Sequence, residues 1–214
     1  MHTEQESGSA ELRRRRLLEL REELIRRFEQ DHGQSEALVF GEGPVEARLM
    51  LIGEAPGEQE TRLHRPFVGK AGKNLDHFLS LSGLKREEIY ITNVVKIRPT
   101  RQGKSGRLSN RPPNREELTF FVPELLREIE IVGPERIAVL GNTPLHALAG
   151  NGVMIGNVHG QFVPIVGSDR TCFALYHPAS LIYNPGLKGV YESDIRLLAD
   201  LLHGHDGCSR ESAE

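Results

Sequence analysis

Three polar side chains lie at the ends of separate apolar runs, where they could share one site. Glu54 directly follows the first run, Asn93 lies near the end of the second, and His177 lies near the end of the last. The carboxyl ends of parallel strands share one edge of a sheet, and ligands bind at that edge. Asn donates and accepts hydrogen bonds side by side, which matches the edge of a pyrimidine. Each residue also has a structural alternative, as a turn cap, a strand-closing amide and a structural histidine respectively.

A glycine-rich, acidic segment, GEAPGEQETRLHRPFVGKAG (residues 53–72), connects the first run to a helical pattern. It lacks the GxxxxGK[ST] spacing of a phosphate loop and the GxGxxG fingerprint of a dinucleotide site. Its backbone can approach a ligand closely at Gly53, Ala55 and Gly57, and Phe67 offers an aromatic face. A flat, neutral heterocycle could therefore lie on Phe67, although this ring could also pack in the core.

The elements that must position these residues follow from periodicity. Four short apolar runs predict buried strands, at residues 47–53, 88–95, 135–141 and 171–178. Helical spacing predicts helices at residues 10–30, 69–84, 114–134, 142–150 and 190–203, and residues 156–169 are typical of a small hairpin. Strands that alternate with helices indicate an α/β fold with three layers, α/β/α, around a central four-stranded parallel sheet.

Composition indicates a single soluble domain. The chain has 214 residues, of which 38% are hydrophobic and 27% are charged, and no apolar run approaches the roughly 20 residues of a membrane span. We expect one domain at residues 10–203 between disordered tails at 1–9 and 204–214. Two distant cysteines and the lack of a secretory signal favour the cytoplasm and no membrane association. The net charge of −3 does not indicate a nucleic-acid binder, but residues 95–115 carry seven basic residues and no acid.

Four motifs, GEAPGEQE…RPFVGKAG, YITNVVKIRP, NRPPNREEL and YHPASLIYNP, resemble those of uracil-DNA glycosylases, most closely the family-4 type. The resemblance runs from about Val39 to Leu202. It implies a four-stranded parallel sheet between helices, which agrees with the periodicity. It also implies a monomeric, monofunctional DNA repair enzyme that flips uracil out of DNA and hydrolyses its N-glycosidic bond. The partner would be DNA containing uracil, and the products would be free uracil and an abasic site.

The resemblance implies catalytic roles for three residues. Glu54 would place a water molecule or give electrostatic support. His177 would donate a hydrogen bond to uracil O2 as negative charge builds on the leaving base, and Asn110 would lie near the reacting centre. The residues that would bind the base are then the backbone of Ala55 and Pro56, the stacking ring of Phe67 and the edge-reading amide of Asn93.

The resemblance also implies a DNA-contacting surface. The segment SLIYNP (residues 180–185) would enter the duplex, with Leu181, Ile182 and Tyr183 as candidate wedges. The basic stretch leaves the end of the second strand and would contact phosphates beside the pocket. Its candidate contacts are Lys96, Arg98, Arg101, Lys104, Arg107 and Arg111.

The chain departs from the family pattern at the cofactor. The family-4 type holds an iron–sulfur cluster on four cysteines, but two of those positions are Ile97 and Phe121 here, and residues 26–38 contain no cysteine. With two cysteines in the whole sequence, four thiolates cannot be supplied. We therefore expect no cofactor and no metal, with apolar packing of Ile97 and Phe121 in place of the cluster.

Two further departures concern the chemistry. The loop at residues 100–109 is longer than usual and basic, but it lacks the histidine that traps the sugar covalently in a related branch. Ala55 stands where some members have an aspartate base, so Glu54 or His177 would have to carry the reaction. Two alternatives stay open: a glycosylase that prefers deaminated purines (hypoxanthine or xanthine), and a catalytically weak protein that binds DNA lesions.

Overall fold

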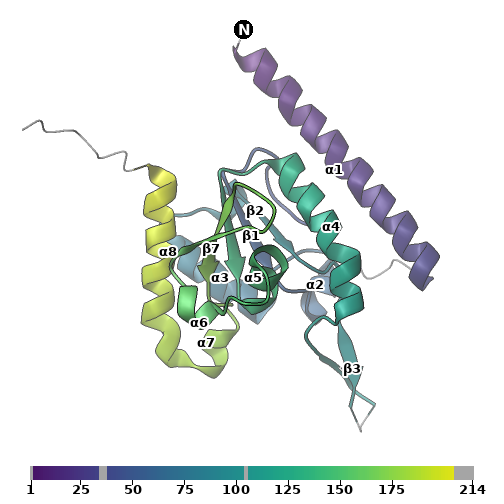
Figure 1. The fold of residues 1–214 in the computed structure, drawn as a ribbon, viewed down its shortest axis with the longest axis vertical. Helices are drawn as coiled ribbons and strands as arrows, with labels where there is room; N and C mark the ends of the chain where they lie inside the picture. The colour runs from purple at the N-terminus through teal and green to yellow at the C-terminus, as the bar shows by residue number, and fades with distance from the viewer. Residues whose placement is uncertain (1, 34–37, 104–105, 205–214) are drawn as a thin grey trace, which may run out of the picture.

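The computed structural model describes residues 2–33, 38–103 and 106–204, and its centre is a five-stranded sheet with helices on both faces (Figure 1). The strand order is β2-β1-β5-β7-β6. Four strands are parallel, namely β1 (Leu49–Gly53), β2 (Ile89–Asn93), β5 (Arg136–Leu140) and β7 (Thr171–Leu175). These confirm the four predicted strands and the three-layer α/β fold.

The fifth strand, β6 (Phe162–Pro164), was expected in a local hairpin but pairs antiparallel with β7. Residues 156–169 do not form a hairpin of their own, since Ile155–Val158 form the short helix α6. The chain then reverses after β6, where Ile165 N donates to Arg170 O at 2.9 Å. Pro164 is compatible with this position because β6 is an edge strand.

Successive side chains of each strand pack in two separate hydrophobic cores, because they face opposite sides of the sheet. Met50 and Ile52 of β1 belong to one core, and Leu49 and Leu51 belong to the other. The first core also contains side chains of α1 (His2–His32), α4 (Arg115–Val132) and α5 (Asn142–Ala149). The second contains side chains of α3 (Lys70–Leu81) and α8 (Lys188–His203).

The N-terminal helix α1 lies beside α4 and is longer than expected (Figure 1). It begins at His2, so residues 2–9 are helical, and the expectation of a disordered tail there is corrected. Extending an existing helix adds one hydrogen bond per residue fixed and needs no new nucleus, which explains the continuation past Ala10. The expected C-terminal tail falls on residues 205–214, outside the described residues, after Gly204 ends α8 with a left-handed backbone (φ 58°).

Most of the remaining elements lie at the carboxyl edge of the sheet. Helix α2 (Glu58–Leu63) follows β1, and α7 (Ser180–Tyr183) follows β7. Between β2 and α4, the strands β3 (Thr100–Gln102) and β4 (Leu108–Asn110) form an antiparallel hairpin that projects from the body (Figure 1). Two 3-10 turns complete the fold, at Arg86–Glu88 and Pro185–Leu187. Within the described residues, no helix has the length and apolar character needed to span a membrane.

Candidate active site

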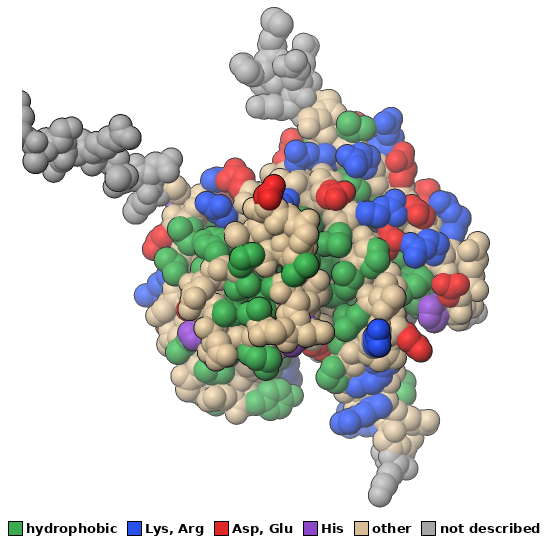
Figure 2. All heavy atoms as spheres, viewed as in Figure 1, with side chains coloured by type: hydrophobic (Ala, Val, Ile, Leu, Met, Phe, Trp, Pro, Cys, Tyr) green, Lys and Arg blue, Asp and Glu red, His purple; other side chains and the backbone are tan. Residues whose placement is uncertain are grey.

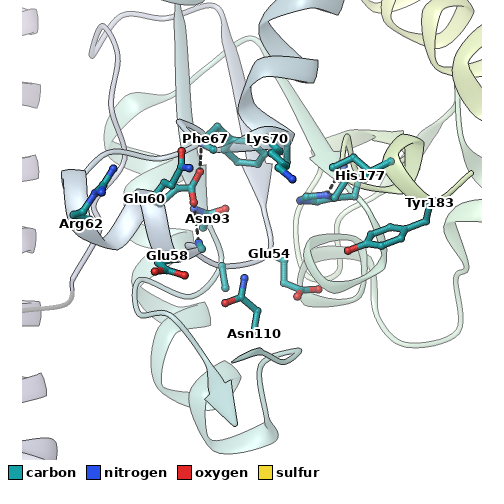
Figure 3. Close-up of a pocket in the computed structure, with 17 residues that line it drawn as sticks. Glu54, Glu58, Glu60, Arg62, Phe67, Lys70, Asn93, Asn110, His177 and Tyr183 are labelled. Atoms are coloured by element: carbon teal, nitrogen blue, oxygen red, sulfur yellow. Dashed lines mark hydrogen bonds between the residues drawn. The ribbon is translucent and has the colours of Figure 1, made fainter. Parts of the chain in front are cut away.

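A cavity of about 610 Å³ opens at the carboxyl edge of the sheet and brings together most of the predicted catalytic and base-binding residues (Figure 3). Its wall includes all three catalytic candidates, Glu54, Asn110 and His177, and the base-binding candidates Ala55, Phe67 and Asn93. Pro56 is the exception among these predictions. It is buried and does not belong to the residues that line the cavity.

Phe67 forms a fixed aromatic wall. The ring is 5% exposed, and the residue has a left-handed backbone (φ 52°), which is uncommon outside glycine. Gly53 and Gly72 permit this arrangement. A Cβ at Gly53 would lie 2.4 Å from Phe67 Cζ, and one at Gly72 would lie 1.9 Å from Phe67 O. Arg86 Nη1 also donates to Phe67 O at 3.2 Å, so the strained residue is held from several sides.

Asn93, the last residue of β2, lines the cavity and has an acceptor atom without a partner among the described residues. It is 3% exposed, and its Oδ1 has no hydrogen-bond partner among the described residues. The atom lies close to Phe67, since a Cβ at Gly53 would approach both side chains within 2.6 Å. A buried acceptor without a partner costs free energy of about 1–3 kcal/mol, so such an atom at a cavity wall is suited to a ligand donor.

His177 is a neutral donor in this environment. Burial lowers the pKa of His177 to about 4, and the nearby charge of Glu60 opposes this shift only in part. Its Nδ1 accepts a hydrogen bond from Ala179 N at 3.1 Å, so the ring proton resides on Nε2. The ring centroid lies 5.9 Å from that of Phe67. The imidazole therefore stays uncharged at neutral pH and keeps one N–H for a ligand.

Glu54 is oriented by a residue that the sequence did not reveal. The hydroxyl of Thr143, in the first turn of α5, donates to Glu54 Oε2. The N-terminal end of a helix also favours a nearby negative charge. Gly141, just before α5, lies against His177, since a Cβ there would be 3.1 Å from His177 Cβ. The start of α5 thus supports both catalytic candidates.

Glu60 is a second residue missed by sequence reasoning. It is 9% exposed and accepts backbone hydrogen bonds from Gly57 (3.1 Å), Val68 (2.9 Å) and Gly69 (2.6 Å). These contacts join the two arms of the loop around the cavity (Figure 3). The signal for part of this role was present, because Gly57 and Glu60 have the spacing of a capping box at the start of α2.

Asn110, at the end of β4, reaches the cavity from the projecting hairpin (Figure 3). Its Oδ1 accepts a hydrogen bond from Arg98 Nε at 2.8 Å, which leaves the amide N–H groups available to the cavity. Arg98 also contacts Glu58, with 3.3 Å between Nη2 and Oε2, and its side chain is 17% exposed. Arg98 was predicted to contact DNA, but in this structure it orients Asn110.

Two other predicted DNA contacts are engaged within the protein. Lys96 is 2% exposed and forms an ion pair with Glu128, so its prediction as a surface contact is wrong. Burial of the charge is possible because oxygen acceptors from two elements surround it. Arg111 makes two hydrogen bonds to Glu117, at 2.7 and 2.8 Å, and its side chain is 28% exposed.

Two exposed cations of the basic stretch lie on the projecting hairpin, where basic side chains gather (Figure 2). Arg101 and Arg107 are both exposed, and Arg101 contacts a residue of the neighbouring strand, with 3.4 Å from its Nε to Ser109 Oγ. Lys104 lies outside the described residues. The sequence did not single out Arg62 and Lys70, which are exposed and line the cavity (Figure 3).

The three candidate wedges of α7 differ in exposure. Tyr183 is 87% exposed and Ile182 is 45% exposed, and both line the cavity. Leu181 is only partly exposed and packs against the second core, so it anchors the helix instead of projecting from it. One helical turn cannot direct three consecutive side chains the same way, so Ile182 and Tyr183 are the more exposed of the three candidates.

The positions expected to replace cluster cysteines are apolar and packed. Phe121 is 1% exposed, with ring centroids 6.1 Å from Phe28 and 4.9 Å from Phe120, and Ile97 packs against the same core. Cys172 is buried in β7, and burial raises its pKa to about 11. No group of three or more His, Cys, Asp or Glu side chains that could hold a metal occurs in the described ranges. These residues do not fit a four-thiolate cluster.

Comparison with known proteins assigns the family. A family model described as the uracil DNA glycosylase superfamily matches residues 40–198. Similar curated proteins include the type-4 uracil-DNA glycosylases of Pyrobaculum aerophilum (37% identical, 78% of this chain and 84% of the relative) and Saccharolobus solfataricus (40%, 77% and 76%). The type-4 enzyme of Thermotoga maritima is 39% identical over 69% of this chain and 72% of the relative. The chain therefore belongs to the uracil-DNA glycosylase superfamily.

Proposed function

We propose that this protein is a monofunctional uracil-DNA glycosylase of DNA repair, which flips uracil out of DNA and hydrolyses its N-glycosidic bond. One observation carries the proposal: Asn93, whose buried Oδ1 has no partner among the described residues, lines the cavity beside the ring of Phe67. Uracil N3–H is a donor suited to this atom, and the Asn93 amide N–H is suited to uracil O4. Stacking on Phe67 would offset part of the stacking lost on flipping, which costs a few kcal/mol.

The reaction needs a donor at the leaving base. The bond between N1 and C1′ breaks with its electron pair on uracil, water adds to C1′, and the proton of water ends on the released base. His177 Nε2–H would donate to uracil O2, where negative charge develops. By analogy with oxyanion donors, such a contact contributes about 2.7–4 kcal/mol to the transition state.

Glu54 would act on the sugar side of the bond. Thr143 holds Glu54 Oε2, which leaves Oε1 to place the attacking water and to support the positive charge that develops on the sugar. Ala55 has no group that could act as a base, so water placement falls to Glu54. Asn110 lies near enough to line the same cavity and would contact the sugar or its phosphate through its amide N–H groups.

The DNA would cross the carboxyl edge of the sheet. Arg101 and Arg107 on the hairpin, and Arg62 and Lys70 at the cavity, would contact phosphates, which position the strand without reading sequence. Tyr183 is the exposed aromatic residue beside the cavity and would fill the space that the flipped base leaves. Lys104 would add to the same phosphate contacts.

The protein would work as a cytoplasmic monomer, without a membrane and without an iron–sulfur cluster. The support for the last point is chemical, since the sequence has two cysteines and Ile97 and Phe121 are packed in apolar surroundings. An absorbance band at about 400 nm in anaerobically purified protein would contradict the absence of a cluster.

The proposal is tested with oligonucleotides, single- and double-stranded, that carry uracil, hypoxanthine or thymine at one position. After incubation and alkali treatment, we expect strand breaks only at uracil. Breaks mainly at hypoxanthine would favour a purine-specific glycosylase. A shift in gel mobility without any breaks would favour a lesion-binding protein, and either result would overturn the proposal.

A further inference from the structure

The side chain of Lys96 contacts the backbone of Asn93, and its ammonium group makes its hydrogen bonds to other groups of the protein. Its Nζ donates to Thr92 Oγ1 at 2.6 Å, to Asn93 O at 2.8 Å and to Glu128 Oε2 at 2.6 Å. An ammonium has three N–H donors, so all of them are satisfied. The lysine therefore closes a short turn back onto the carbonyl of Asn93.

Glu128 of α4 links this lysine to the rest of β2. Its Oε1 accepts a hydrogen bond from the hydroxyl of Tyr90 at 2.8 Å, and its Oε2 accepts one from Thr92 Oγ1 at 3.1 Å. Gly41 leaves the space for this carboxylate, since a Cβ there would lie 2.6 Å from Glu128 Oε1. The buried network thus ties α4 to the strand that ends at Asn93.

Such a network is a costly way to hold a strand. Charges that leave water lose their hydration, and a buried ion pair is often no more stabilising than apolar side chains of similar volume. The side chains of Lys96 and Glu128 are 3% and 5% exposed, so both are desolvated. Their position therefore calls for a reason other than stability.

The reason lies in what Asn93 must do. Its Oδ1 has no partner in the described protein, so this atom cannot be fixed by a hydrogen bond of its own. The side chain must therefore be oriented from its backbone and by packing. Packing comes from Phe67 and Gly53, and Val94 N donates to Gly53 O at 2.9 Å, which fixes the backbone on one side. The contact from Lys96 fixes the carbonyl of Asn93.

We propose that Lys96, with Glu128 as its counter-charge, is a positioning residue for base recognition and holds the Asn93 amide in the orientation that reads the base. This inference rests on the proposed function of the same cavity. It predicts that loss of the pair weakens recognition of the base and leaves contacts to the DNA backbone unchanged.

The test uses a double variant, Lys96→Met with Glu128→Gln. Removing the lysine alone would leave a buried carboxylate unpaired, whereas the double variant removes both charges and keeps an acceptor for the hydroxyl of Tyr90. The matched control is Arg27→Met with Glu124→Gln. It removes the ion pair of Arg27 with Glu124, which joins α1 to α4, and also the contact of Glu124 with Arg127. Glu124 lies one helical turn from Glu128 on α4, and neither contact involves Asn93.

Two affinities separate positioning from general destabilisation. Free uracil, measured as an inhibitor, reports on the base pocket, and an oligonucleotide with an abasic site reports on DNA contacts without a base. For the Lys96 variant we expect the inhibition constant of uracil to rise about tenfold, which corresponds to about 1.4 kcal/mol. We expect its affinity for abasic DNA, and both affinities of the control, to stay within about twofold of wild type.

Unchanged inhibition by uracil in the Lys96 variant would overturn the inference, and so would an equal weakening in the control. If this double variant does not fold, Lys96→Leu with Glu128→Gln serves, because it also removes both charges and leaves a smaller apolar side chain in the same space; unchanged uracil inhibition would again overturn the inference. Wild-type protein that does not release uracil from DNA would instead refute the proposed function. The two failures are therefore distinguishable.

Discussion

The base pocket and the β3–β4 hairpin lie side by side at the carboxyl edge of the sheet, but they are held in different ways. In the pocket, a second group orients two of the catalytic candidates: Thr143 donates to Glu54, and Ala179 N donates to His177. In the hairpin, Arg101 and Arg107 are exposed, and each strand has three residues. Chemistry at one bond needs fixed geometry, whereas contacts with a flexible polyanion tolerate mobile charges. The following predictions test this division.

The largest effect is expected from His177→Ala. Removing one donor to a developing negative charge costs roughly 10²–10³ in kcat, so we expect a loss of that size in uracil excision. Binding of abasic DNA should change little, because the imidazole contacts the base. The measurement is single-turnover excision from a uracil oligonucleotide. A rate within a few-fold of wild type would refute the role of His177.

A smaller loss is expected from Thr143→Val, which keeps the shape of the side chain and removes the hydroxyl that holds Glu54. A hydrogen bond to a charged group contributes about 1.5–3 kcal/mol, so we expect kcat to fall roughly tenfold or more with KM nearly unchanged. Thr143→Ser is the control and should restore most of the rate. Equal rates for the valine and serine variants would show that the hydroxyl is not needed.

The hairpin should affect binding instead of chemistry. In the variant with both Arg101→Ala and Arg107→Ala, we expect DNA affinity to fall several-fold and the slope of log K against log salt to decrease by roughly two. The excision rate at saturating protein should not change. Titrations at several salt concentrations measure the slope, and an unaltered slope would remove these residues from the phosphate contacts.

The smallest effect is expected from pH near neutrality. Because burial lowers the pKa of His177 to about 4, the neutral donor persists well below the usual titration range of histidine. The ratio of wild-type to His177→Ala rates should stay constant from about pH 8 to 5.5. It should decline as pH falls through about 4, because protonation of Nδ1 removes the acceptor through which Ala179 N–H orients the ring. A ratio that already declines at about pH 6.5 would indicate a histidine whose pKa is not lowered.

The lowered pKa of His177 also predicts how the stability of the fold changes with pH. The folded-state pKa of His177 is depressed below the unfolded value, so the unfolded chain binds more protons between the two values. Its contribution to stability is therefore full above about pH 6.5 and is lost as pH falls through about 4. Thermal unfolding of wild type and His177→Ala across this range measures the difference, which should narrow at acid pH.

Local patterns predicted the elements and most of the pocket. Buried parallel strands are apolar on both faces, so all four were visible as short runs, and their ends placed Glu54, Asn93 and His177 at one edge. The edge strand β6 was misjudged, because its partner β7 lies beyond a turn and a three-residue strand has little pattern of its own.

Long-range contacts explain what the sequence did not reveal. Lys96 stands in a basic stretch and was interpreted as a surface residue, but its counter-charge, Glu128, is 32 residues away on α4. Thr143 is 89 residues from Glu54, and nothing in its local pattern distinguishes it from a helix-starting residue. Glu60 differs, because its capping spacing with Gly57 is local and could have been recognised.

The division between pocket and hairpin is tested most directly by combining the two variants. Single-turnover excision and DNA affinity would be measured for wild type, His177→Ala, the Arg101→Ala and Arg107→Ala variant, and all three changes together. We predict that His177→Ala lowers only the excision rate, that the hairpin changes lower only affinity, and that the combined effects add in free energy. The account would be contradicted if the hairpin variant excised uracil more slowly at saturating protein, with a fold-loss in rate as large as its fold-loss in DNA affinity.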